Sequence, residues 1–415
     1  MKVKIPFGKG YYDLNIDSHF DVLKRKKEKP LKDTGREFLY SFDHPISSKP
    51  LKELVKGKDN IMIVVSDRER PIPSKVILSK LLPYLRREGF TKKNINFIIA
   101  SGAHGIDFKK DALEILGNEI CAKYKVYFNN CYKEEDYIGT GYIEDGIEVR
   151  VNKHFFNAGF KILTGLINPH VYAGYSGGRK SVVPGLCDAK SWPLIHGVKL
   201  IDHTGTRLGN LKNNWLHKIG TKVAKISGVD FIINVTLTSD KKISGIYCGD
   251  LERAFETGVK YLEDQLKIKT DKKYDIAISN AGGHPLDANF FQMIKGMVTP
   301  IPYLKKGGEI ITIGEGKEGM GIAKFVEIAQ RILDLKQWRK ELDFKDYEME
   351  QWTFQAYHNL FNRAKVKLVS PLFKKEPCLK NLVEEIEDLD SYLDKKIKNN
   401  PDIKIGVFLD GPYCL

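Results

Sequence analysis

The sequence lacks the cysteine pattern and the long apolar runs that mark several classes of protein. Its six cysteines form no C-x-x-C pair and no zinc-ribbon spacing, so neither a disulfide framework nor a zinc module is indicated. No apolar stretch reaches the about 18 residues of a membrane span, and the N-terminus has no apolar export segment. We therefore expect free thiols, no membrane association and a cytoplasmic location.

Two nucleotide-binding motifs are also missing. No G-x-G-x-x-G opens a helix after a strand, which disfavours an NAD-dependent dehydrogenase. A Walker A loop needs lysine directly after glycine, but Arg179 stands between Gly178 and Lys180. An ordinary ATPase is therefore disfavoured as well.

The charge balance is basic, with 67 Lys+Arg against 53 Asp+Glu and a net charge of +14. Such an excess raises the question of nucleic-acid binding. The lysines, however, are spread through short clusters between apolar segments, and no aromatic residues recur among them at a regular spacing. We expect them on solvated loops and helix ends, with attraction for small anions and no nucleic-acid partner.

Apolar runs bounded by turn residues alternate with helical periods, which is typical of an α/β protein. Helix-like stretches are expected at 75–88, 250–266, 325–335 and 379–398, and strands at 60–65, 95–100, 160–167, 274–279, 309–313, 366–370 and 403–409. The charged, turn-like segment 267–273 separates two such series. The expectation is two α/β domains, residues 1–266 and 274–415, with the active site in the cleft between them.

A glycine-rich segment follows the third of these strands. Gly177 and Gly178 precede Arg179 and Lys180, so backbone N–H groups could approach a phosphate closely beside two displayed cations. The amine of Lys180 could contact a ligand held there or be acylated by it, and a neighbouring cation favours the neutral, nucleophilic amine. The alternative is an ordinary strand-to-helix turn with solvated basic residues.

Titratable side chains follow the first three strands. Asp67 and Arg70 come after the first strand, His104 after the second and His170 after the third. Ligands of open α/β sheets bind at the carboxyl ends of strands, so these side chains are expected to converge on one crevice. Two histidines on opposite sides of a substrate could each give or take a proton. The alternative, that each is structural, stays open at this point.

His196, which follows the lysine loop, is a candidate for a lone metal ligand. No carboxylate stands near it at ligand spacing, so any metal bound there would need other ligands. A structural histidine on an apolar turn is the alternative.

The order of these residues resembles one family, that of lactate racemase and the other nickel-pincer 2-hydroxyacid racemases and epimerases. Members have an Asp-x-x-Arg strand end, two catalytic histidines, a glycine-rich loop with a cofactor-bearing lysine, a nickel-binding histidine and a later Gln-x-x-Lys pair. The resemblance covers most of the chain. The matching positions are, in turn, Asp67 with Arg70, His104, His170, Lys180, His196, and Gln292 with Lys295.

The resemblance implies nickel and a nickel-pincer nucleotide, pyridinium-3-thioamide-5-thiocarboxylic acid mononucleotide, as cofactors. It implies covalent tethering for Lys180 and a nickel position for His196, with Asp67, Gly177, Gly178 and Arg179 at the nucleotide. Other proteins would have to build and metallate this cofactor, so cofactor-synthesis proteins are implied as transient partners.

The implied reaction inverts C2 of a small 2-hydroxycarboxylic acid by reversible hydride transfer to the pyridinium ring, with His104 and His170 as acid and base. Arg70, Gln292 and Lys295 would hold the substrate carboxylate. A lactate-like acid is the expected substrate, and a sugar-acid (aldonate) 2-epimerase is the alternative within the family. A non-catalytic nucleotide- or anion-binding protein is the alternative of another class.

Departures from the family pattern affect the substrate more than the reaction. Glu69 stands where threonine is frequent, and Gly105 stands where arginine follows the first catalytic histidine. Trp352 matches either an aromatic residue that lines the family's cleft or a core-packing tryptophan. Lactate, malate, longer acids and aldonates therefore stay open as substrates.

Overall fold

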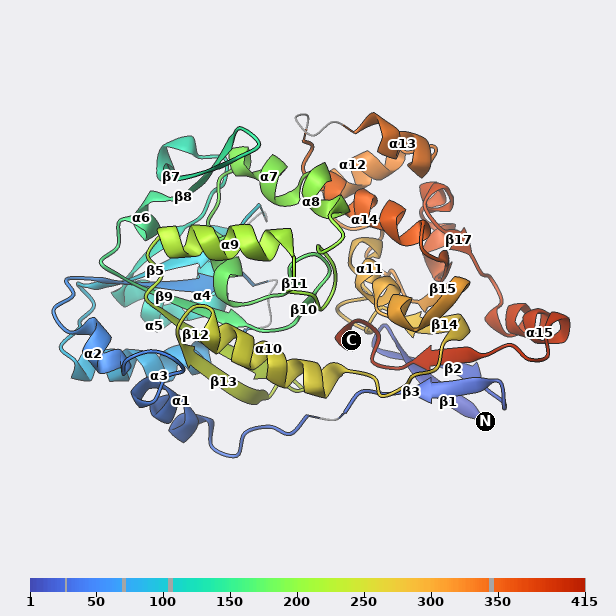
Figure 1. The fold of residues 1–415 in the computed structure, drawn as a ribbon, viewed down its shortest axis with the longest axis horizontal. Coiled ribbons are helices and arrows are strands. Elements are labelled where there is room, and N and C mark those ends of the chain that lie inside the picture. Colours follow the sequence, from blue (N-terminus) through green and yellow to red (C-terminus); the bar gives the residue numbers. More distant parts are fainter. Residues whose placement is uncertain (27, 69–71, 104–106, 343–346, 415) are drawn as a thin grey trace. The chain divides into compact units, whose positions relative to one another are not determined.

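The structure is a computed structural model that describes residues 1–415 except 27, 69–71, 104–106, 343–346 and 415 (Figure 1). It divides into two compact units, Lys27–Gln265 and a second unit made of Met1–Lys26 with Leu266–Leu415. Both units are built on a largely parallel sheet with helices, so the expected α/β class with two α/β domains is confirmed. Among the described residues no helix is both long enough and apolar enough to cross a membrane.

The unit Lys27–Gln265 has a six-stranded sheet with the order β13-β12-β9-β4-β5-β6. All neighbours pair in parallel except β12 and β13, which form an antiparallel edge. The predicted strands at 60–65, 95–100 and 160–167 are confirmed as β4, β5 and β9. The bounds are β4 Ile61–Ser66, β5 Ile95–Ala100, β6 Lys125–Phe128, β9 Phe160–Leu166, β12 Phe231–Leu237 and β13 Ile243–Gly249.

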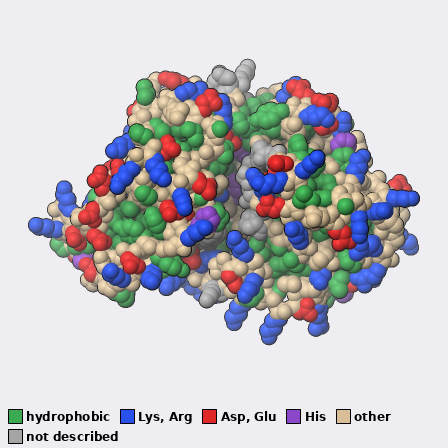
Figure 2. Space-filling model, turned by 180° about the vertical axis from the view of Figure 1, so that it is seen from behind, with side chains coloured by type: hydrophobic (Ala, Val, Ile, Leu, Met, Phe, Trp, Pro, Cys, Tyr) green, Lys and Arg blue, Asp and Glu red, His purple; other side chains and the backbone are tan. Residues whose placement is uncertain are grey.

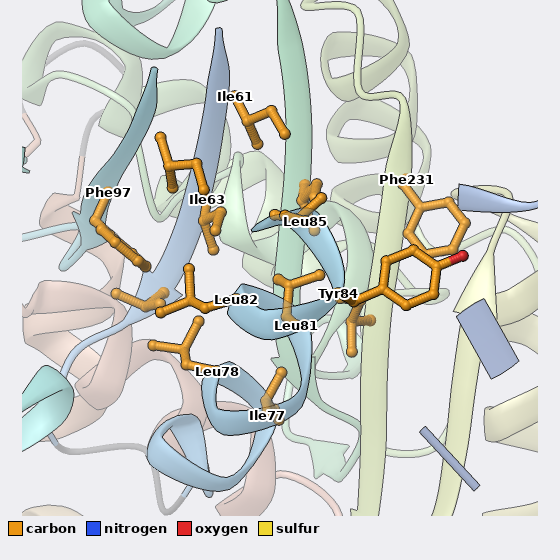
Figure 3. Packing of buried hydrophobic residues seen from close by; sticks show 14 of the residues in the cluster. Ile61, Ile63, Ile77, Leu78, Leu81, Leu82, Tyr84, Leu85, Phe97 and Phe231 are labelled. Atoms are coloured by element: carbon orange, nitrogen blue, oxygen red, sulfur yellow. The ribbon is translucent and has the colours of Figure 1, made fainter. Parts of the chain in front are cut away.

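Helix α3 (Ser74–Arg87) shows why this sheet is stable. Its apolar residues recur at helical spacing, and Figure 3 shows Ile77, Leu81 and Leu85 directed toward the strands. They pack against fully buried side chains such as Ile63 and Phe97. Burying each such side chain contributes about 1.5 to 3 kcal/mol. The core thus fixes the strands, and with them the positions of the loops that follow their carboxyl ends.

Helices and short hairpins surround this sheet. The predicted helices at 75–88 and 250–266 are confirmed as α3 and α10. The helices are α1 Thr34–Asp43, α2 Leu51–Val55, α3 Ser74–Arg87, α4 Phe108–Leu116, α5 Asn118–Lys123, α6 Lys153–Phe156, α7 Trp192–His196, α8 Val198–Asp202, α9 Trp215–Ile226 and α10 Arg253–Leu266. The hairpins are β7 Tyr137–Glu144 with β8 Ile147–Asn152, and β10 Pro169–His170 with β11 Gly174–Tyr175.

The second unit has a six-stranded sheet with the order β17-β16-β15-β14-β18-β3, and every pairing in it is parallel. An antiparallel hairpin of β1 and β2 forms a separate two-stranded sheet in the same unit. The strands are β1 Lys2–Phe7, β2 Gly10–Asn15, β3 Phe20–Leu23, β14 Tyr274–Asn280, β15 Leu304–Ile313, β16 Lys365–Val369, β17 Glu384–Glu385 and β18 Ile405–Phe408.

The start of the chain corrects the expected domain division. Residues Met1–Lys26 belong to the unit formed by the C-terminal residues, whereas the sequence placed all of 1–266 in one domain. The reason is that β3 pairs with β18 along the full length of both strands, and the backbone N–H of Arg25 donates to Asp410 Oδ2 at 2.8 Å.

The helices of the second unit also depart from expectation in two places. The helices are α11 Phe290–Val298, α12 Ala323–Arg331, α13 Leu335–Glu341, α14 Gln351–Phe361 and α15 Leu389–Asn399. The expected helix 325–335 ends early, because Asp334 caps a new helix through the N–H of Gln337. The expected helix 379–398 is broken, because β17 adds to the sheet edge beside β16 before α15 begins.

Candidate active site

Lys180 lies in a short 3₁₀ helix, Gly178–Ser181, that packs beside strands β4, β9 and β12. The hydroxyl of Ser181 donates to the carbonyl of Thr164 in β9 at 3.2 Å, which ties the helix to the sheet. Lys180 itself is only 8% exposed. The lysine proposed to carry a cofactor is therefore held by the sheet and is not on a loose surface loop.

The glycines around Lys180 allow close backbone packing. Gly177 has φ of +86°, and a Cβ on it would lie 2.7 Å from Oδ1 of Asn234. A Cβ on Gly185 would lie 3.0 Å from the Cβ of Ala100 at the end of β5. The N–H of Gly178 donates to Asn234 Oδ1 at 3.0 Å, so this amide is already used within the protein and is not offered to an anion.

Arg179 does not stand beside Lys180 as a displayed cation, and that expectation is corrected. Its side chain is 2% exposed, with Nη2 donating to the carbonyl of Ala173 at 2.6 Å and Nη1 to that of Gly177 at 3.4 Å. The guanidinium lies 4.4 Å from the ring centroid of Phe255. Burial lowers the pKa of Arg179 to about 9, so the group still carries its charge at neutral pH. Arg179 thus holds the loop of Ala173 against the lysine helix.

His170 ends the short strand β10 and is half-buried. Its Nδ1 accepts from the backbone N–H groups of Tyr172 and Ala173, at 3.3 Å each. These contacts orient the ring. The loop is fixed further by Asn214, whose Nδ2 donates to the carbonyl of Tyr172 at 2.5 Å.

His104 lies outside the described residues, whereas the residues just before it, which follow β5, are described. The N–H of Gly102 donates to the carbonyl of Gly185 at 3.0 Å, and the N–H of Gly185 donates to the carbonyl of Lys180 at 3.2 Å. The segment that follows β5 is therefore bonded to the loop that follows Lys180. This agrees with the expectation that these strand ends converge.

His196 is the last residue of α7 and is 6% exposed. Its ring centroid lies 4.4 Å from that of Trp192, and the indole of Trp192 lies beside Gly102. In the described part of the chain, no three histidine, cysteine or carboxylate side chains gather into a metal site. A metal bound by His196 would therefore take its other ligands from a bound group, and imidazole nitrogen with sulfur donors suits nickel.

Asp67 follows β4 directly and is 2% exposed. A pocket of about 260 Å³ opens here, between the end of β4 and the start of α3. Its lining includes Ser74 and Lys75, whose hydroxyl and cation suit phosphate oxygens, and Asp67, whose carboxylate suits ribose hydroxyls. Arg68 also lines the pocket, but its Nη1 pairs with the buried carboxylate of Asp111 at 3.2 Å. Lys180 and His196 do not line this pocket. Their amine and imidazole nitrogen are the groups that would hold a tethered nickel mononucleotide. Arg70 lies outside the described residues.

In the other unit, Gln292 and Lys295 lie on one face of α11. The Nζ of Lys295 donates to Oε1 of Gln292 at 2.5 Å. Trp352 on α14 is half-buried, and its ring centroid lies 5.8 Å from that of Phe291 in an edge-on arrangement. The tryptophan is therefore next to the Gln-x-x-Lys face, which leaves both of its expected roles open.

Sequence reasoning missed residues that organise the site without reacting. Asn234 supports the glycine loop, Asn214 the loop of His170, and Trp192 packs on His196. One signal was available, because Asn234 interrupts the otherwise apolar start of the buried strand Phe231–Leu237. A buried amide within a central strand needs a hydrogen-bond partner and indicates a local task.

Figure 2 shows one face of the molecule, on which Lys and Arg side chains are interspersed with Asp and Glu. Several surface lysines pair with carboxylates, among them Lys123 with Glu119 and Lys305 with Asp275, at 2.8 Å in both cases. Such exposed pairs contribute little to stability, but they show how part of the basic excess is accommodated.

Two family models match the chain, "Lactate racemase N-terminal domain" over residues 7–209 and "Lactate racemase C-terminal domain" over residues 269–413. A lactate racemase of Lactiplantibacillus plantarum is 32% identical over 89% of this chain and 88% of its own length. A lactate racemase of Thermoanaerobacterium thermosaccharolyticum is 28% identical over 99% of this chain and 97% of its own.

The structure of the lactate racemase apoprotein from Thermoanaerobacterium thermosaccharolyticum superposes with a TM-score of 0.91 at 27% identity, covering 100% of this chain and 99% of that one. Both halves of the sequence and the whole fold thus agree with one family. The chain belongs to the lactate racemase family.

Proposed function

We propose that this protein is a racemase that inverts C2 of a 2-hydroxycarboxylic acid, with a lactate-like acid as substrate. Family membership supports an isomerase of this type. The observation that carries the proposal is the position of Gly102, which bonds to the lysine loop through Gly185 and lies against Trp192, the residue that packs on His196. These contacts support a single site for the proposed tether, the proposed metal ligand and the segment that leads to His104.

Lys180 would hold the cofactor through its amine, and His196 would offer an imidazole nitrogen to the nickel. The bound group supplies a reversible hydride acceptor, which avoids forming a carbanion beside the substrate carboxylate. Lys180 and His196 are both nearly buried, so water has little access to either group. A covalent tether keeps the group in place through many turnovers.

His170 and His104 would exchange the hydroxyl proton, one on each face of the substrate carbon. In His170 the acceptor role of Nδ1 places the proton of the neutral ring on Nε2, so the ring starts as a donor to the substrate oxygen. Taking a proton at Nε2 requires the ring to give up these weak Nδ1 contacts. We therefore propose that His170 exchanges the proton at Nε2 between its imidazolium form and the neutral ring protonated on Nδ1, and that Nδ1 accepts from neither N–H group in these two forms.

The substrate carboxylate must stay fixed while the keto acid turns about its C1–C2 bond. We propose that Arg70 supplies a bidentate fork and Lys295 a point charge, with Gln292 as a neutral donor. The bond from Lys295 to Gln292 shows that both side chains reach the same point above α11.

The test is to produce the protein together with cofactor-synthesis proteins, which we propose as its transient partners. Intact mass, nickel content and interconversion of D- and L-lactate would be measured, with malate, longer 2-hydroxy acids and aldonates as further substrates. A lysine adduct, bound nickel and lactate racemisation are expected. Activity on aldonates alone would change the substrate class. Bound nucleotide without any turnover would make the chain a non-catalytic binding protein.

A further inference from the structure

A buried cluster of polar side chains lies immediately before the helix that ends in His196. Asp188 is 1% exposed, and its Oδ1 accepts from both the backbone N–H and the hydroxyl of Ser191, at 3.1 and 2.6 Å. Its Oδ2 accepts from Nη1 of Arg150 in β8 at 2.9 Å. The hydroxyl of Ser191, itself fully buried, accepts in turn from the backbone N–H of Arg150 at 3.0 Å.

The guanidinium of Arg150 extends the cluster to the neighbouring strand. Its Nη2 donates to the carbonyl of Tyr137 at 3.2 Å, at the start of β7. The hairpin of β7 and β8, the carboxylate of Asp188 and the hydroxyl of Ser191 therefore form one continuous set of hydrogen bonds. The bonds made by the Asp188 carboxylate and the Arg150 guanidinium are charge-assisted and therefore stronger than bonds between neutral groups.

Helix α7 depends on such support because it is short. It has five residues, Trp192–His196, begins directly after Ser191 and contains Pro193 in its first turn. A helix of this length is unstable on its own, since it has too few internal hydrogen bonds to offset the entropy of ordering. The orientation of His196 is thus set by what holds the residues just before the helix, and by the indole of Trp192 against its ring.

We infer that Arg150, Asp188 and Ser191 form a positioning cluster that sets the imidazole of His196 for nickel. The inference rests on the proposed function, in which His196 is the protein's ligand to the metal. Groups that orient a metal ligand change affinity without touching the metal, and losing one weakens binding by about 10- to 100-fold. The cluster acts on the nickel alone, since the organic group would be held independently by Lys180.

The experiment uses protein loaded with cofactor, in the variants Asp188→Asn, Ser191→Ala and His196→Ala. Asp188→Asn keeps an oxygen for Ser191 but loses the charge that faces Arg150, and Ser191→Ala removes a single hydroxyl. The matched control is Asp230→Asn. This partly buried carboxylate accepts from the N–H of Lys161 at 2.8 Å, just before β12 and so at the amino end of the sheet.

The readouts are the lysine adduct by intact mass, nickel per adduct, and the rate of nickel loss to excess EDTA. We expect loaded Asp188→Asn and Ser191→Ala to lose nickel about 10- to 100-fold faster than the loaded wild-type protein. The amount of lysine adduct should be the same in all three proteins. Asp230→Asn should lose nickel at the original rate. Hydrogen exchange of the apoprotein should be faster over residues 189–196 in Asp188→Asn, and unchanged in β12. Should Asp188→Asn not fold, Ser191→Ala alone decides.

Two results would overturn the inference, and they can be told apart. Nickel loss at the original rate in both cluster variants, with His196→Ala unable to hold nickel, would reject the positioning role and leave the proposed function intact. Full nickel binding by His196→Ala would reject the ligand assignment itself, and the role of the cluster with it.

Discussion

Asn234 and Gly178 are joined by a hydrogen bond of 3.0 Å from the glycine N–H to the side-chain Oδ1 of the asparagine. Asn234 belongs to a central strand of the sheet, and Gly178 opens the short helix that carries Lys180. The short helix that carries Lys180 is thus tied to a strand of the sheet through its first residue. The same oxygen lies only 2.7 Å from where a Cβ on Gly177 would stand, and Gly177 has φ of +86°, so both observations explain the glycine at that position.

Replacing Lys180 should abolish the covalent adduct, because it removes the amine to which we propose the cofactor is joined. Lys180→Ala should therefore show no mass increment on the peptide that contains residue 180. The matched control is Lys161→Ala, since Lys161 is 7% exposed and lies in the same unit but donates to the carbonyl of Ala158. An adduct that persists in Lys180→Ala would contradict the assignment.

Removing His170 should slow turnover by about 10²- to 10⁴-fold, as for other positioned proton-transfer groups. His170→Ala should keep its adduct and nickel, because the histidine touches neither in the proposed arrangement. The control is His154→Ala, a histidine that stacks on Tyr127 with 4.1 Å between the ring centroids. Near-normal racemisation in both directions by His170→Ala would make this residue structural. His104→Ala should behave like His170→Ala.

Truncating Lys295 should weaken substrate binding and slow turnover together, by about 1.5 to 3 kcal/mol for the charged hydrogen bond lost. Gln292→Ala should have a smaller effect, because a neutral donor is lost and Lys295 remains. Arg70→Ala should resemble Lys295→Ala. The control is Lys305→Ala, which removes only an exposed pair with Asp275. Unchanged kinetic constants for the best substrate would remove these residues from the site.

His217 should make the apoprotein less stable as the pH falls. Burial, with a further contribution from Arg179, lowers the pKa of His217 from 6.5 to about 3. Below pH 6.5 the unfolded chain therefore takes up a proton that the folded chain does not, and the free energy of unfolding decreases. At 1.36 kcal/mol per pH unit, the decrease between pH 6.5 and 4.5 is on the order of 2 kcal/mol.

The variant His217→Phe keeps a ring on Phe255, whose centroid lies 6.1 Å from that of His217, but has no titrating group. Urea unfolding at a series of pH values should show that the free energy of unfolding depends less steeply on pH in the variant than in the wild-type apoprotein. Equal slopes for the two proteins between pH 6.5 and 4.5 would contradict the assignment.

The buried strands could be predicted closely from the sequence, because an uninterrupted apolar run bounded by turn residues is a local signal. The strand at 95–100 matches β5 at both ends, and the strand at 60–65 differs from β4 by one residue. Strand β3 could not be found this way, because its place depends on pairing with β18 at the other end of the chain. The same holds for β17, whose two residues are a strand only beside β16.

For the candidate site, too, only what depends on the local sequence could be predicted. The order of Asp67, His170, Lys180 and His196 is a sequence property, and it indicated the family that the comparisons show. The burial of Arg179 was not predictable, because it depends on Phe255 and on the carbonyl of Ala173, which only the fold brings to it.

The central claim is that C2 is inverted by hydride transfer on a cofactor held by this chain. The most direct measurement is racemisation of lactate deuterated at C2 by the loaded protein in ordinary water, with the deuterium content of the product followed over time. The account predicts that the product largely retains its deuterium, because the transferred hydrogen does not exchange with solvent. Loss of the label at the rate of racemisation would show proton abstraction by a solvent-exchangeable base and would contradict the account.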